Sequence, residues 1–85
     1  MMRKELELRN LPRFRIMEYL VEAGGAKTDE LAVEGAGWSA RLEAMEPAKI
    51  ITMTVRRDLL IIEGEDDAVE EKYAFMRRKT RRGGG

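Results

Sequence analysis

The sequence has no cysteine and no histidine, and serine occurs once, at Ser39. The first two absences exclude disulfides, Cys/His zinc sites, thiol nucleophiles and every catalytic triad that depends on an imidazole. Ser39 falls in the middle of a predicted strand with no histidine to activate it, which argues against nucleophilic catalysis. We therefore predict that the chain is not an enzyme and that it uses no metal ion and no cofactor.

Glutamine is also absent, asparagine occurs once, and arginine and glutamate dominate the polar residues. This composition resembles that of thermophilic proteins, which avoid heat-labile side chains and use networks of ion pairs. No apolar signal segment follows Met1, and no apolar run is long enough to cross a membrane. A cytoplasmic location is therefore expected.

The length of 85 residues, with 44% hydrophobic and 38% charged side chains, predicts one folded domain. We assign residues 1–82 to a single α+β domain and residues 83–85, which are all glycine, to a disordered tail. Sixteen basic side chains balance sixteen acidic ones, so the net charge alone indicates no partner.

Hydrophobic periodicity predicts the first two elements. Apolar and charged side chains alternate over residues 4–9 as in a half-buried strand, and apolar spacings of three and four over residues 12–23 indicate a helix. Asn10 precedes this helix and can provide a cap, and Gly24 and Gly25 end it. The apolar positions of the helix are Phe14, Ile16, Met17, Leu20 and Val21.

The first predicted hairpin is built around a glycine-rich turn. A short strand that contains Leu31 ends at residues 35–37, Gly-Ala-Gly, which permit positive φ. The partner strand covers residues 38–44, with Trp38 on its apolar face, and ends before Pro47.

A second hairpin is predicted further along the chain. Residues 50–55 are rich in β-branched side chains and residues 59–62 are an uninterrupted apolar run, so we take both as strands with a turn near Arg57. A helix then begins at residues 66–67, with acidic side chains in its first turn and basic ones in its last turn, as the helix dipole favours.

The resulting order is β-α-β-β-β-β-α, a mostly antiparallel five-stranded α+β sheet with two helices on one face. The order is similar to that of the TATA-box-binding-protein-like folds, and a ferredoxin-like split βαβ sandwich is the alternative. Neither architecture implies a function.

The densest group of carboxylates runs over residues 63–71, where binding of a divalent cation or acid/base chemistry is one interpretation. The spacing matches no calcium loop, and Asp66 and Asp67 are better explained as the N-terminal residues of a helix. Trp38 could stack on a ligand, but a lone tryptophan at an inward strand position is more simply part of the core. Neither feature predicts a ligand site.

The last 14 residues hold six basic side chains and no acidic one. One interpretation is that they stabilise the C-terminal end of the last helix and pair with the acidic middle of the chain. The alternative is binding of RNA or DNA, because arginine recognises phosphate. The residues of this predicted nucleic-acid contact are Lys72, Arg77, Arg78, Lys79, Arg81 and Arg82.

Residues 81–85, Arg-Arg-Gly-Gly-Gly, resemble the glycine tail of ubiquitin-like modifiers and sulfur carriers. The resemblance implies that the C-terminal carboxylate is activated and joined to sulfur or to lysine. Those proteins open with a β-hairpin and reach the tail from a strand, whereas here a single strand precedes the first helix and a helix leads into the tail. The tail is also one glycine longer, so the carrier role is a further alternative.

Residues 9–13, RNLPR, and residues 74–79, AFMRRK, resemble small uncharacterised proteins of thermophilic bacteria. That family has no known function, so the resemblance implies no activity, ligand or site. The main functional prediction is therefore a non-enzymatic binding module whose role is protein interaction or self-association.

The apolar run over residues 59–62 also predicts a homodimer. Whichever pair of its side chains faces the helices, the other pair points outward, where a row of polar residues is expected. A second copy could cover that pair in a symmetric dimer. The predicted interface residues are Ile51, Met53, Leu60 and Ile62, and no further protein partner is identified.

Overall fold

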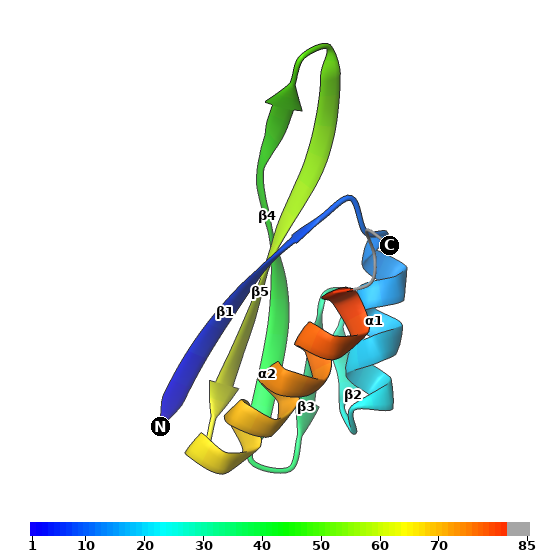
Figure 1. Cartoon of the computed structure of the whole chain (residues 1–85). Coiled ribbons are helices and arrows are strands. Elements are labelled where there is room, and N and C mark those ends of the chain that lie inside the picture. Colours follow the sequence, from blue (N-terminus) through cyan, green and yellow to red (C-terminus); the bar gives the residue numbers. More distant parts are fainter. Residues whose placement is uncertain (82–85) are drawn as a thin grey trace.

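The computed structural model describes residues 1–81. This part of the chain has five strands and two helices (Figure 1). They are β1 (Met2–Arg9), α1 (Arg13–Glu22), β2 (Ala26–Asp29), β3 (Ala32–Gly35), β4 (Trp38–Ile50), β5 (Met53–Gly64) and α2 (Asp66–Arg81). Residues 82–85, and with them the predicted disordered tail, lie outside the described residues.

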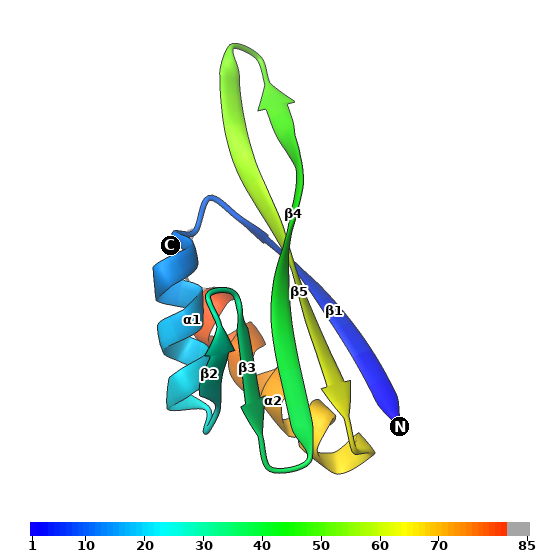
Figure 2. The ribbon, with the colours of Figure 1, turned by 180° about the vertical axis from the view of Figure 1, so that it is seen from behind.

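The strands form one antiparallel sheet in the order β1-β5-β4-β3-β2. Strands β2 to β5 follow one another as a meander, and β1 pairs with β5 at the far edge. Both helices cover the same face of the sheet, as Figure 1 and Figure 2 show from opposite sides. The predicted α+β class, the element order and the antiparallel sheet are confirmed.

The core lies between the covered face of the sheet and the helices. In β5 the even-numbered side chains point toward the helices, and Leu60 and Ile62 are fully buried there. Helix α1 contributes Ile16 and Leu20 to this layer, and α2 contributes Met76. Burying an aliphatic side chain of this size is worth about 1.5–3 kcal/mol, so this layer is the main source of stability.

Helix α1 turns only part of its predicted apolar side toward the core. Ile16, Met17 and Leu20 are buried, whereas Phe14 and Val21 are 62% and 47% exposed. Phe14 and Val21 are three and four residues from buried Met17, so they lie beside the buried side of the helix, at its edge. This distribution leaves an apolar strip of α1 on the surface.

The bend between β1 and α1 depends on Asn10. Its φ is 57°, a left-handed conformation that asparagine adopts more readily than most residues. Its backbone N donates to the carbonyl O of Arg56 at 2.9 Å. Helix α1 follows Pro12, and no side chain of residues 1–81 caps it, so the predicted capping role of Asn10 was wrong.

The second hairpin is longer than predicted and turns at a different place. Strand β4 continues past Pro47, because an irregularity in the register between Met45 and Ala48 accommodates the proline. The turn lies at residues 51–52, and Arg57, where the turn was predicted, pairs with Met45 in the middle of the hairpin.

Strand β2 was not predicted, because its four side chains are all exposed and give no alternating pattern. Residues 50–55, predicted as one strand, contain the turn of the second hairpin instead. In Figure 1 the end of this hairpin projects beyond both helices, and the chain measures 43 × 23 × 21 Å.

The glycine-rich turn between β3 and β4 is confirmed. Gly37 has a φ of 80°, and Gly35 pairs with Trp38 across the turn. A Cβ atom on Gly35 would collide with the indole of Trp38, so the missing side chain makes room for the ring. Trp38 is 5% exposed and belongs to the core, as predicted.

Candidate functional site

Helix α2 connects the sheet to the C-terminal glycines and carries the predicted nucleic-acid contact. Its inner side packs Val69 and Met76 into the core. Acidic side chains occupy its first turn and basic ones its last turn, so both ends of the helix dipole meet opposite charge, as predicted. The last described residue, Arg81, belongs to this helix, and Arg82 lies outside the described residues.

The last turns of α2 are tied to α1. Lys79 Nζ lies 2.7 Å from Glu22 Oε2 and 5.5 Å from the centre of the Tyr19 ring. The same Nζ lies 5.7 Å from the ring centre of Phe75 in its own helix. A cation held by a carboxylate and two rings has little freedom, so this end of α2 has a fixed position on the domain.

Lys72 also makes contacts within the chain. Its Nζ lies 5.6 Å from the centre of the Trp38 ring and 3.3 Å from Glu71 Oε1. The Lys72 side chain is only 19% exposed. Two of the six residues of the predicted nucleic-acid contact, Lys72 and Lys79, are therefore largely engaged by the domain itself.

The arginines of α2 lie over aromatic side chains of the same helix. The Arg77 guanidinium is 5.8 Å from the Tyr73 ring centre, and that of Arg78 is 5.9 Å from the Phe75 ring centre. Helical spacings of four and three residues bring these pairs together. Arg77 and Arg78 are both exposed, and their contact with nucleic acid stays a prediction.

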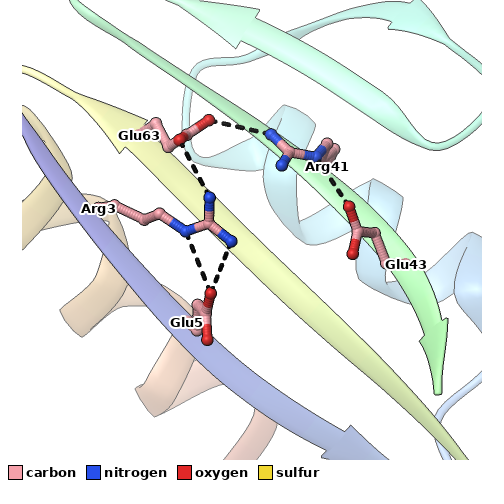
Figure 3. Close-up of polar contacts among 5 residues, drawn as sticks. All are labelled: Arg3, Glu5, Arg41, Glu43 and Glu63. Carbon is pink, nitrogen blue, oxygen red and sulfur yellow. Dashed lines mark hydrogen bonds and ion pairs between the residues drawn. The ribbon is translucent and has the colours of Figure 1, made fainter.

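The open face of the sheet carries a network of ion pairs across three strands (Figure 3). Arg3 of β1 contacts Glu5 at 2.7 Å and Glu63 of β5 at 3.5 Å. Arg41 of β4 contacts the same Glu63 at 2.9 Å and Glu43 at 3.2 Å. Hydrogen bonds to Glu63 and Glu43 raise the pKa of Arg41, so the positive charge at the centre of the network is secured.

A second ion cluster continues this face toward the long hairpin. Glu7 accepts hydrogen bonds from Arg57 at 2.9 Å and from Arg9 at 2.6 Å. These bonds, the one from Arg57 most strongly, lower the pKa of Glu7 from 4.5 to about 2. Arg57 also donates to the carbonyl O of Glu46 at 3.1 Å, so one guanidinium joins β1, β5 and β4.

The ion pairs cover an apolar residue. Ile61 points away from the helices and stands beside Glu5 and Arg41 in register, yet it is 1% exposed. The helices of residues 1–81 lie on the other face, so the long stems of the charged side chains keep water away from it. We predicted that a second copy would cover the outward pair of residues 59–62, but for Ile61 the chain's own side chains do so.

The four residues of the predicted dimer interface separate into two pairs. Leu60 and Ile62 lie under the helices at 0% exposure, which corrects that half of the prediction, because they present no surface to a second copy. Ile51 and Met53 lie at the end of the long hairpin and are 95% and 65% exposed.

The structure gives no functional role to the other features that the sequence offered as candidates. Ser39 lies on the open face, paired with Glu63 and Glu34 in neighbouring strands. Within residues 1–81, no group of three or more acidic side chains is arranged to hold a metal ion. Neither described helix is both long and apolar enough to cross a membrane.

Comparison with models of known protein families identifies a family that matches this chain. The model of the family described as Archaeal MoaD-like protein matches residues 4–85. Because the match covers nearly the whole sequence, C-terminal glycines included, the chain belongs to the archaeal MoaD-like protein family. No curated protein matches the sequence closely enough to be counted as a relative.

This membership overturns two predictions. The resemblance to uncharacterised proteins of thermophilic bacteria, drawn from residues 9–13 and 74–79, was wrong. The main functional prediction, a module for protein interaction or self-association, was also wrong, and the family supports the sulfur-carrier alternative drawn from the glycine tail. MoaD-like carriers are not themselves enzymes, so the prediction of a non-enzymatic chain is confirmed.

Proposed function

We propose that this protein is a sulfur carrier and that the C-terminal carboxylate of Gly85 accepts the sulfur atom. The observation that carries the proposal is the family match, which includes the glycine tail together with the folded domain. Three consecutive glycines have no side chains to obstruct a narrow active site, and they bring the carboxylate within reach of one. The domain, with α2 fixed on α1, serves as the handle by which other proteins recognise the carrier.

The chemistry requires activation, because a carboxylate reacts with a sulfur nucleophile only when one of its oxygens can leave. In the first step, a carboxylate oxygen of Gly85 attacks the α-phosphorus of a nucleoside triphosphate, and pyrophosphate leaves. In the second step, hydrosulfide attacks the acyl carbon, and the nucleoside monophosphate leaves with the former carboxylate oxygen. The product is a C-terminal thiocarboxylate, and with hydrosulfide as donor nothing is oxidised or reduced.

The activating enzyme is a separate protein in this proposal, because the chain has no histidine and no cysteine to carry out catalysis. The exposed arginines of the last turns of α2, Arg77, Arg78 and Arg81, favour an acidic docking surface on that enzyme. Complementary charge acts mainly on the rate of association, so the rate of activation should fall as salt is added. Consumption of a nucleoside triphosphate agrees with the cytoplasmic location, which stays a prediction.

The absence of cysteine makes the product directly detectable. The chain contains no thiol side chain, so brief treatment with a thiol-reactive alkylating reagent near neutral pH labels a thiocarboxylate far faster than any other group in the protein. We expect protein isolated from its own cells to contain a fraction in which one oxygen is replaced by sulfur and which takes up one alkyl group. Fragmentation in the mass spectrometer should place that group at Gly85.

The matched control is a chain without residues 83–85, expressed in the same cells. Its domain should fold, because the core residues lie between Leu8 and Met76. We expect this control to take up no alkyl group. Full-length protein that is never labelled would contradict the proposal, and Gly85 found in an amide bond to a lysine of another protein would replace it with a modifier role.

A further inference from the structure

Residues 48–55 form a two-stranded projection, which we call the arm, beyond the covered part of the sheet (Figure 1). The register decides which side chains share a face of the arm. Lys49 and Thr54 pair on one face, and the pairs on the opposite face are entirely apolar. The side chains of this apolar face are Ala48, Ile50, Met53 and Val55.

The tip of the arm has residues that folding alone does not favour. Ile51 is 95% exposed and has a φ of 58°, a conformation that β-branched residues rarely adopt and that two-residue turns usually give to glycine or asparagine. Its neighbours Ile50 and Met53 are 48% and 65% exposed. A two-stranded ribbon is only marginally stable by itself in water, so exposed apolar side chains at its end indicate a contact with another surface.

An apolar groove of about 640 Å³ lies between α1 and the turn that joins β2 to β3. Its apolar walls are Phe14, Met17 and Val21 of α1 together with Leu31. Phe14 and Val21 are the exposed residues at the edge of the buried side of α1. The charged residues that line the groove are Arg13, Glu18, Lys27 and Glu30.

We propose that two copies of this chain associate reciprocally, with Ile51 and Met53 of each copy seated in the groove of the other. A tip does not reach the groove of its own chain, because the arm extends away from both helices in Figure 1 and Figure 2. Lys49, next to the apolar tip, can pair with Glu18 or Glu30 of the groove. Of the two basic residues there, Arg13 is already held by Asp58, which leaves Lys27. Two equivalent contacts close the assembly as a dimer.

The proposed contact is separate from the sulfur-carrying end of the chain. Tyr19 and Glu22, which hold Lys79 of α2, are not among the residues that line the groove. Pairing through the groove therefore leaves the end of α2 accessible. The dimer does not depend on the proposed function, and its failure would leave that function unaffected.

Sedimentation equilibrium of the full chain at micromolar concentrations tests the proposal. We expect the wild-type mass to approach twice the 9.7 kDa of one chain. An arm variant, Ile51→Glu with Met53→Glu, and a groove variant, Phe14→Glu with Val21→Glu, should each sediment as monomers. All four positions are exposed, so both variants should fold, which the fluorescence of the buried Trp38 can verify.

A mixture of the two variants gives the sharpest result. The arm variant keeps an intact groove and the groove variant keeps an intact arm, so the mixture can form one of the two contacts. We expect a mixed dimer that is at least about tenfold weaker than the wild type but clearly above either variant alone. Thr54→Glu on the polar face of the arm and Arg15→Glu on α1, which changes the charge by as much as the groove variant does, are the controls for added negative charge and should remain dimeric.

Three outcomes would overturn the proposal. The first is a wild-type mass near 9.7 kDa at every concentration. The second is a groove variant that stays dimeric, since that result would assign the dimer to contact between the arms themselves. The third is a mixture in which neither variant associates with the other.

Discussion

Arg13, in the first turn of α1, holds Asp58 of β5 through two nitrogen atoms, with Nε at 3.0 Å and Nη2 at 2.9 Å from the same carboxylate oxygen. Asp58 is 2% exposed and is the one buried charged side chain among the described residues. It stands opposite Leu8 in register, near the level where β5 leaves the covered part of the sheet. The pair therefore fastens the start of α1 close to the base of the arm.

Removing the cation from this pair should destabilise the domain. Arg13→Ala leaves the Asp58 carboxylate buried without its partner, and we expect the free energy of unfolding to fall by about 3 kcal/mol. Arg15→Ala is the control, because Arg15 is exposed and its pair with Glu18 spans 3.5 Å, so its loss should cost less than about 0.5 kcal/mol. Urea denaturation of both variants makes the comparison, and equal effects would show that burial of Asp58 does not decide the cost.

Truncation of Ile61 should be costly although its side chain is on the open face. Ile61→Ala removes a side chain that is 1% exposed, and we expect a loss of about 2–5 kcal/mol, with about 0.5–1.5 kcal/mol for Ile61→Val. Ile61→Glu should unfold the domain, as Ile62→Glu should on the other face. A loss below about 1 kcal/mol for Ile61→Ala would show that the ion pairs do not shield this residue in solution.

The Glu7 cluster should contribute to stability at neutral pH and lose its effect in acid. Because the pKa of Glu7 is lowered from 4.5 to about 2, the contribution is complete above pH 4.5 and is lost as the pH falls through about 2. Glu7→Gln should therefore be less stable than the wild type at neutral pH, and the difference should shrink over that range. Thermal unfolding against pH measures it, and added salt should reduce the difference, since the pair is partly exposed.

Gly64 should resist substitution. Its φ is 149°, and a Cβ atom there would lie against the carbonyl of Gly37 and the backbone of Trp38. We expect Gly64→Ala to cost more than about 1 kcal/mol, and Ala36→Gly in the nearby turn to cost less. The chain has one tryptophan, so the fluorescence of Trp38 follows unfolding in both variants. If Gly64→Ala left the free energy of unfolding unchanged, the backbone at Gly64 could move away from Gly37 and Trp38 at little cost.

Elements that bury one face in regular alternation could be predicted from the sequence. β1 and the first half of β4 alternate buried or half-buried with more exposed side chains, and α2 has charges that suit both helix ends. The turn of the second hairpin could not be predicted, because residues 51–52 are isoleucine and threonine, whereas Pro47 gives a false end signal inside β4. The predicted number of strands equals the observed number only because the incorrectly predicted strand over residues 50–55 compensates for the missed strand β2.

The candidate site was visible in the sequence only in part. The glycine tail alone indicated a carrier, whereas the order of helices and strands differs from that of the carriers it resembles. The family match over nearly the whole chain outweighs this difference in element order. The ion pairs above Ile61 required the register, because the partners Arg41 and Glu63 come from different strands. The sequence does contain alternating charges in these strands. Because the turn of the second hairpin was predicted at the wrong place, the charges were not aligned with their true partners.

Strand β1 precedes the other described strands in the sequence, and we expect it to be the last of them to pair. It pairs with β5, which follows most of the chain, whereas β2 to β5 each pair with a neighbour across a short turn. Closing such a long loop costs more chain entropy than forming a hairpin, so the meander should assemble first. Residues 2–9 should therefore stay without a partner until β5 has formed, and we expect the charges that alternate along them to hinder pairing with other chains during that time.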